Sequence, residues 1–196
     1  MKKTFRLLIT LLACAVVTIA CSEKAEEPAA VEEVASVEEA AAVEEATADE
    51  ATKLTVIEKI DIAAAPEAVW ESAKNFGELH VWHPGVESST NTDGNNIGSV
   101  RVLDLGGPTI TEELVAFDDE NKSFTYKINE VDPAVLPVKD YISSFSVEDN
   151  GQGGSSITWD GSFNLVGTPK PEDIQAGVSG IYRGGIENLK STLEAD

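Results

Sequence analysis

The sequence IDIAAAPEAVWESAKNFGELHVWHP, residues 60–84, carries the strongest structural signals of the chain. A strand ends at Ile62, and Pro66 follows where a helix can begin, because the first N–H groups of a helix have no intrahelical partner. Glu67 places a carboxylate in the first turn, which the helix dipole favours. The sequence WHP at residues 82–84 comes about one turn after this short helix. The stretch therefore predicts a strand followed closely by short helical segments.

Apolar and polar residues alternate from 156 to 165, which predicts a strand with one buried face. Turn-forming runs of Asp, Asn and Gly separate this strand from its predecessors, and connections this short suit antiparallel hairpins. The other strands are expected near residues 53–62, 86–91, 98–105, 109–117, 124–128 and 141–147.

After Pro171 the apolar spacing becomes helical and predicts one amphipathic helix of about twenty residues. Seven strands spaced about 4.8 Å apart make a sheet about 30 Å wide, whereas one helix is about 10 Å across. The sheet must therefore curl around the helix, and imperfect filling leaves a cavity. Four glycines in the helix either make room for a ligand or a close approach to the sheet, or mark a kinked or late-starting helix. They are Gly177, Gly180, Gly184 and Gly185.

Three motifs together resemble a known family: APEAVW at residues 65–70, WHP at 82–84 and GIYRGGIENLK at 180–190. They resemble the polyketide cyclase/dehydrase and lipid-transport branch of the START-like (SRPBCC) superfamily, and particularly its MxaD-like periplasmic members. The resemblance spans residues 53–196. It implies an α+β helix-grip (START-like, Bet v 1-like) fold: a curved seven-stranded antiparallel sheet around a long C-terminal helix, with two short helices after the first strand. It also implies a hydrophobic cavity.

The N-terminus predicts a lipoprotein signal peptide over residues 1–20. Basic residues precede the uncharged run Leu7–Ala20, which reaches about 21 Å as a helix and is too short to span a bilayer of about 30 Å. The boundary before Cys21 resembles a bacterial lipobox, with Thr18 where that pattern usually has Leu, so Cys21 is the predicted lipidation site. Cys14 is an alternative lipidation site. A second alternative is an ordinary signal peptide of a soluble protein, with no lipidation. Ser22 after the cysteine suggests, by resemblance, an outer-membrane destination.

Residues 21–52 form a predicted tether rich in Ala, Glu and Val. Residues 22–52 hold 11 acidic side chains, one lysine and no aromatic residue. Paired glutamates recur every six residues, a step that puts successive valines on different faces of a helix, so no amphipathic stripe results. We interpret the segment as a charge-extended spacer, with an interaction tail as the alternative.

The remaining residues, 53–196, are long enough for one domain with a core. They carry 24 acidic and 10 basic side chains, a net charge of −14. This charge repels phosphate backbones and anionic membrane surfaces, so no nucleic-acid partner is expected, and membrane contact is expected through the N-terminal lipid only. A cationic periplasmic protein is a compatible partner.

Residue types that carry chemistry are scarce in this domain. Both cysteines lie in the signal segment, so the domain has no thiol. His80 and His83 have the i, i+3 spacing of a metal pair, but no third ligand follows at fixed spacing and Pro84 breaks the turn. No phosphate loop or nucleophile elbow is present. We therefore predict no catalytic residue, no metal and no cofactor.

Two charged residues on strands pose a question of register. An inward Ile110 would place Glu112 in the cavity, where a buried charge needs a partner. An Arg101–Glu112 pair across neighbouring strands is one hypothesis, and exposure of both to water is the other. The loop at 130–140 is either a lid or a stiff crossing. The candidate cavity residues are Trp70, Trp82, Glu112, Tyr126, Tyr141, Phe145, Trp159, Phe163 and Tyr182.

The sequence thus predicts a lipid-anchored protein of the cell envelope, in the outer membrane and facing the periplasm, that binds a small hydrophobic ligand. The resemblance to MxaD-like proteins adds an accessory role in a periplasmic oxidation system. Two alternatives remain at this point. One is an enzyme of the polyketide cyclase or dehydratase type that uses the same cavity, and the other is an acidic protein-interaction module.

Overall fold

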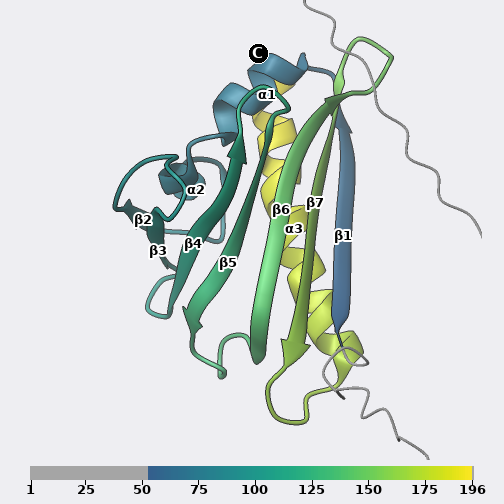
Figure 1. Ribbon diagram of the computed structural model, residues 1–196. Helices are drawn as coiled ribbons and strands as arrows, with labels where there is room; N and C mark the ends of the chain where they lie inside the picture. Colours follow the sequence, from purple (N-terminus) through teal and green to yellow (C-terminus); the bar gives the residue numbers. More distant parts are fainter. Residues whose placement is uncertain (1–52, 196) are drawn as a thin grey trace, which may run out of the picture. The chain divides into compact units, whose positions relative to one another are not determined.

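The computed structural model describes residues 53–195, shown in Figure 1. The predicted signal peptide, Cys21 and the tether lie outside the described residues. Eleven elements follow one another along the described chain: β1 (Leu54–Ile62), α1 (Pro66–Ala73), the 3-10 helix η1 (Phe76–Glu78), α2 (Leu79–Trp82), β2 (Ser88–Asn91), β3 (Val100–Asp104), β4 (Thr109–Asp118), β5 (Ser123–Val131), β6 (Val138–Asp149), β7 (Ser155–Leu165) and α3 (Pro171–Leu193).

The strands form one seven-stranded antiparallel sheet in the order β1-β7-β6-β5-β4-β3-β2. The chain enters at one edge, crosses to the other through the short helices, and returns by successive hairpins until β7 pairs with β1. The long helix α3 then runs along one face of the sheet (Figure 1). This arrangement confirms the α+β helix-grip fold that the sequence predicts, including the short helices after the first strand.

Both main helices begin as the sequence indicates. Pro66 opens α1 with Glu67 in the first turn, and the indole N–H of Trp70 donates to Asp119 at 2.7 Å, which ties the helix to the end of β4. Pro171 opens α3, and Lys190 lies in its last turn, where the helix dipole favours a cation. Both helices therefore begin at the prolines that the sequence indicates, and α3 ends after a lysine that suits its C-terminal dipole.

The glycines of α3 do not delay or interrupt the helix, so the late-starting interpretation is wrong. A Cβ atom at Gly177, Gly180 or Gly184 would meet open space. At Gly185 it would lie 2.5 Å from the His83 ring and 3.0 Å from Trp159. The close approach of helix to sheet thus depends on one of the four glycines.

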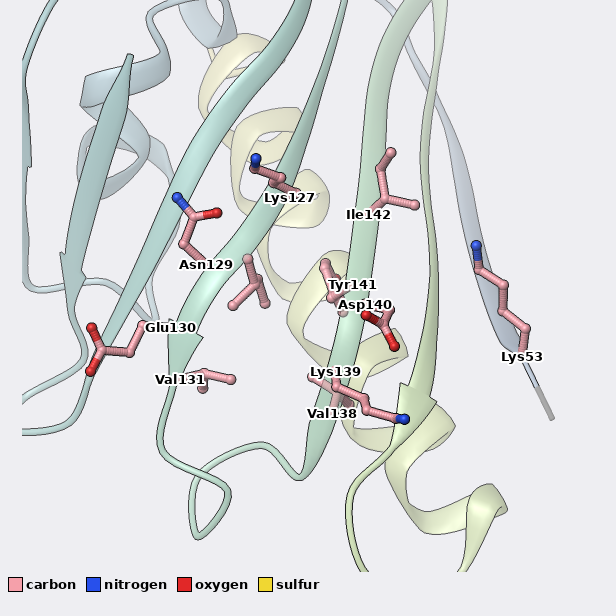
Figure 2. A pocket seen from close by; sticks show the side chains of 11 residues that line it. Lys53, Lys127, Asn129, Glu130, Val131, Val138, Lys139, Asp140, Tyr141 and Ile142 are labelled. Atoms are coloured by element: carbon pink, nitrogen blue, oxygen red, sulfur yellow. The ribbon is translucent and has the colours of Figure 1, made fainter. Parts of the chain in front are cut away.

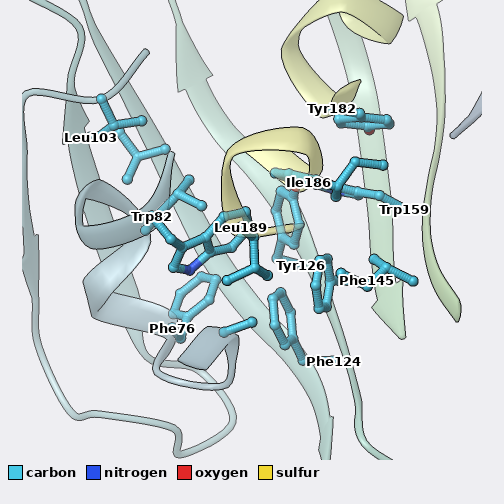
Figure 3. Packing of buried hydrophobic residues seen from close by; sticks show 14 of the residues in the cluster. Phe76, Trp82, Leu103, Phe124, Tyr126, Phe145, Trp159, Tyr182, Ile186 and Leu189 are labelled. Atoms are coloured by element: carbon cyan, nitrogen blue, oxygen red, sulfur yellow. The ribbon is translucent and has the colours of Figure 1, made fainter. Parts of the chain in front are cut away.

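The core lies between α3, the short helices and the inner face of the sheet. Aromatic side chains dominate it, as Figure 3 shows. Phe145 stacks on Phe124 with ring centroids 5.4 Å apart, and Trp159 stacks on Tyr182 at 4.6 Å. Offset aromatic pairs of this kind stabilise a fold beyond the area they bury. They form a rigid wall beside the candidate site.

Candidate functional site

A cavity of about 120 Å³ lies between the sheet and α3. By comparison, a cavity of about 150 Å³ binds benzene, so this smaller one holds at most one ring-sized group. We call it the inner cavity. Its lining is mostly apolar and consists of Leu79, His83, Gly85, Val86, Leu103, Leu105, Ile110, Glu112, Tyr126, Ile128, Leu136, Tyr141, Trp159, Val178, Ile181 and Tyr182.

The alternation of β4 turns Glu112 inward. Ile110, Glu112 and Leu114 are all buried, and Glu112 lies opposite Arg101 of β3. The Arg101 Nε donates to Glu112 Oε2 at 2.6 Å, and its Nη1 donates to the carbonyl oxygen of Phe76 at 2.7 Å. The guanidinium also lies 4.1 Å from the Phe76 ring centroid. The hypothesis of an Arg101–Glu112 pair is confirmed, and the alternative that both face water is wrong.

This ion pair leaves one carboxylate oxygen unused. Burial raises the pKa of Glu112, and the Arg101 guanidinium opposes that shift. Oε2 takes the bond from Arg101, whereas Oε1 accepts no hydrogen bond from any group within residues 53–195. Because Glu112 lines the inner cavity, Oε1 is an acceptor available to a ligand.

A second polar group lies beside the inner cavity and contains only neutral hydroxyls. We define the hydroxyl cluster as Tyr126, Tyr141, Ser143 and Tyr182. Tyr182 donates to Ser143 Oγ at 3.0 Å, and Ser143 donates to the carbonyl oxygen of Asp160 at 2.5 Å. Because the Tyr182 hydrogen is used in this way, Tyr141 donates to the Tyr182 oxygen.

The indole of Trp159 completes the hydroxyl cluster. Its N–H is shared between Tyr126 and Ser143, with both distances at 3.1 Å. Burial raises the pKa of Tyr182 to about 12 and raises the pKa values of Tyr126 and Tyr141 well above their ordinary value. The tyrosines therefore stay protonated and neutral near pH 7.

His83 joins the loop after α2 to α3. The backbone N–H of Gly85 donates to Nδ1 at 3.1 Å, so that nitrogen carries no proton. Nε2 then carries the proton and donates to the carbonyl oxygen of Ile181 at 2.9 Å. Burial lowers the pKa of His83 and favours this neutral form. Since both ring nitrogens are engaged, His83 acts as a clamp between the loop and the helix.

The structure divides the nine candidate residues named from the sequence into two sets. Five line the inner cavity: Glu112, Tyr126, Tyr141, Trp159 and Tyr182. The other four are buried in the core and do not line it: Trp70, Trp82, Phe145 and Phe163. A ligand role for the first set stays a prediction.

Several lining residues were absent from the prediction. Val178 and Ile181 belong to the helical apolar pattern, which does not show where a cavity lies. Val178 is buried, whereas Ile181 lines the cavity although it is 44% exposed. Leu136 belongs to the loop between β5 and β6, and no periodicity covers a loop. Its side chain is buried against the inner cavity, so this loop forms part of the wall.

Two features are absent from the part of the chain that the structure describes. No cluster of three or more His, Cys, Asp or Glu side chains within residues 53–195 is placed to hold a metal ion. In the same residues, no helix has the length and apolar character needed to cross a membrane.

Solved structures share this fold at low sequence identity. Protein XoxI from Bacillus cereus is 29% identical, with a TM-score of 0.65 over 71% of this chain and 95% of the other. An uncharacterized protein from Bacillus thuringiensis is 30% identical, with a TM-score of 0.64 over 72% of this chain and 99% of the other. Ara h 8.0201, at 16% identity and a TM-score of 0.61 over 74% of this chain and 99% of its own, shares the fold alone.

No curated protein matches the chain significantly. The family model described as polyketide cyclase / dehydrase and lipid transport matches residues 53–194. That match covers the whole sheet, the short helices and α3, and therefore includes every residue of the inner cavity. The chain belongs to the polyketide cyclase/dehydrase and lipid transport family.

Proposed function

We propose that this domain binds a small, mostly apolar molecule non-covalently, and that a hydroxyl or N–H group of the ligand donates to Glu112 Oε1. One observation carries the proposal: an apolar cavity has a buried carboxylate in its wall with an oxygen that no protein group occupies within residues 53–195. Pockets for small molecules have this composition, with apolar walls and a few polar groups that set the orientation. The family match supports a hydrophobic ligand.

An enzyme of the cyclase or dehydratase type is the alternative use of the same cavity. Such a reaction needs an acid and a base within reach of the substrate. His83 has no free nitrogen lone pair, and the raised pKa values of Tyr126 and Tyr141 keep their hydroxyls protonated near pH 7, so that they do not accept a proton and are weak acids. Glu112 alone remains as a proton acceptor. The geometry therefore favours binding.

The binding proposal is tested by native mass spectrometry of protein purified from its own host. We expect a co-purifying apolar molecule. Val178→Phe places a ring in the inner cavity and should abolish the bound mass. Val81→Phe makes the same change on an exposed face of α2 and should retain it. Equal occupancy in both variants, or no bound molecule in the unaltered protein, contradicts the proposal.

The proposal extends to the cellular setting. The chain is lipidated at Cys21 and lies at the outer membrane facing the periplasm, with residues 21–52 as an acidic spacer. The lipobox-like boundary and the basic, then apolar, N-terminus support this assignment. Mass spectrometry of the mature N-terminus tests it: a diacylglyceryl-modified cysteine at position 21 is expected, and an unmodified terminus elsewhere contradicts it.

An accessory role in a periplasmic oxidation system completes the proposal. Its support is the resemblance of GIYRGGIENLK at residues 180–190 to MxaD-like proteins, together with an acidic surface that suits a cationic partner. Crosslinking in intact cells should capture a periplasmic oxidoreductase with a basic surface. Capture of unrelated envelope proteins alone contradicts the accessory role and leaves the ligand-binding proposal intact.

A further inference from the structure

A second pocket, of about 700 Å³, lies on the side of the sheet away from α3, between β5 and β6 (Figure 2). We call it the outer pocket. Polar and apolar residues alternate around it, as expected for a depression across two exposed strands. Its lining residues are Lys53, Lys127, Ile128, Asn129, Glu130, Val131, Val138, Lys139, Asp140, Tyr141 and Ile142.

The outer pocket exists because the β5–β6 ladder stops early. Pairing between the two strands covers residues 123–127 and 142–146, although β5 continues to Val131 and β6 begins at Val138. Beyond the last pair, β5 stays with β4 and β6 stays with β7. Asp140 has a φ of 52° where the β6–β7 register shifts. We define the seam as residues 128–131 and 138–141.

The seam places the outer pocket directly against the inner cavity. Ile128 and Tyr141 line both spaces. The backbone of the sheet does not close the seam, because β5 and β6 are not paired there. A single layer of side chains therefore separates the outer pocket from the inner cavity.

The inner cavity is small, so the outer pocket beside it is the space into which a larger ligand could extend. At about 120 Å³ it accommodates one ring-sized group, so a larger ligand must extend out of it. Along α3, Trp159 stacks on Tyr182 with ring centroids 4.6 Å apart, while Gly85 and Ile181, which also line the inner cavity, are exposed. The seam offers a path with only two side chains to displace.

The charge of the outer pocket differs from that of the domain. Three lysines and two carboxylates line it, whereas the domain has a net charge of −14. The Lys127 ammonium lies 3.2 Å from Glu113 and its side chain is 44% exposed, so a ligand can reach it. Lys139 is exposed on the other side of the seam (Figure 2). Lysine ammonium groups bind carboxylate, sulfonate and phosphate oxygens.

We propose that the ligand is an anionic amphiphile that enters through the seam. Its apolar body passes Ile128 and Tyr141 into the inner cavity, and its acidic head stays in the outer pocket beside Lys127 and Lys139. The inference rests on the proposed function, since it requires an apolar ligand in the inner cavity, and it adds the chemical class of that ligand and its route.

A matched pair of fluorescent probes tests the head group. 8-Anilinonaphthalene-1-sulfonate carries an anionic head, and N-phenyl-1-naphthylamine has the same apolar body without it. We expect the sulfonate to bind more tightly. Lys127→Gln with Lys139→Gln should weaken sulfonate binding by up to about fivefold per lysine, the factor that corresponds to an exposed ion pair, and should leave the neutral probe within about twofold. Lys59→Gln, on an exposed position of β1, is the control and should change neither.

Entry through the seam is tested by stopped-flow fluorescence with the neutral probe. Ile128→Trp should slow association at least about tenfold by filling the passage, as expected when binding requires a displacement. Tyr141→Ala should accelerate it, which keeps the test decisive if the tryptophan variant does not fold. Ile57→Trp on the exposed face of β1 is the control and should leave the rate unchanged.

The outcomes separate the two proposals. Absence of any co-purifying molecule in native mass spectrometry overturns the proposed function and this inference with it. Failure of both probes to bind overturns the inference alone, because each probe is larger than the inner cavity and must extend through the seam. Binding of the neutral probe with no preference for the sulfonate, or with association rates that neither seam variant changes, overturns the inference alone.

Discussion

Two polar groups are buried beside the same cavity, and different interactions stabilise them. Arg101 and Glu112 form an ion pair whose two side chains are 2% and 6% exposed. The hydroxyl cluster holds neutral groups that donate to one another in a chain ending at a backbone carbonyl. Loss of one partner leaves a buried charge in the first case and a buried neutral dipole in the second. The ion pair should therefore tolerate substitution far less well than the hydroxyl cluster.

The largest expected effect is that of Arg101→Met. The variant leaves Glu112 buried without its cation, so we expect the free energy of unfolding to fall by about 3–5 kcal/mol, measured by urea denaturation. Adding Glu112→Leu removes the unpaired charge as well and should restore much of the loss. Equal destabilisation of the single and double variants would show that Arg101 acts instead through its packing against Phe76.

The next effect concerns how closely α3 presses on Trp159, the N–H donor of the hydroxyl cluster. Gly185→Ala would bring a methyl group within 2.5 Å of the His83 ring and 3.0 Å of Trp159, so we expect a loss of about 1–3 kcal/mol. The adjacent Gly184→Ala meets open space and should stabilise the helix by up to about 1 kcal/mol. Thermal unfolding of the two variants measures both changes, and shifts of the same sign would contradict the close approach.

A smaller effect is expected within the hydroxyl cluster itself. Tyr182→Phe removes the bond to Ser143 and leaves Tyr141 without its acceptor, while Ser143 keeps the Trp159 N–H. We expect a loss of about 1 kcal/mol in urea denaturation. Tyr126→Phe should cost less, because Tyr126 accepts only a shared N–H. A loss for Tyr182→Phe as large as that for Arg101→Met would abolish the distinction between the two groups.

The smallest effect is a pH dependence from the His83 clamp. Burial lowers the pKa of His83, so the unfolded chain takes up a proton first as the pH falls below the ordinary histidine value of 6.5. The stability contributed by neutral His83 is complete above that value and is lost as the pH decreases through its lowered pKa. His83→Gln should flatten this slope of unfolding free energy against pH, whereas His80→Gln, at an exposed position, should not. Identical slopes in both variants would contradict this role.

Local patterns in the chain were sufficient for most of the fold. The alternation at 156–165 and the helical spacing after Pro171 persist because each element has one buried face, and a buried face leaves a periodic trace. The end signals at Pro66 and Pro171 also act locally, through backbone N–H groups within one turn. The positions of Arg101 and Glu112 left two registers open, because a lone charge in a strand is compatible with either face.

The candidate site was predicted less completely for a physical reason. The alternation in the sequence predicts that Phe145 and Tyr126 both point into the core. In the structure Phe145 is fully packed, whereas Tyr126 borders the inner cavity. A void forms where side chains from several elements fail to fill the space, so it belongs to no single segment. Leu136 could not be predicted to line the inner cavity either, because it lies in a loop, where no periodic pattern shows which side chains point inward.

The sequence by itself determined the seven strands, the long helix and the inward aromatic residues, because propensity, capping and periodicity act over a few residues. Only the tertiary structure decided that Glu112 pairs with Arg101, that Gly185 is the glycine at the close contact, and that the β5–β6 ladder ends at Lys127. Each of these depends on contacts between residues from different elements. Such contacts are set by how whole elements pack, and so they determine where this protein has room for a ligand.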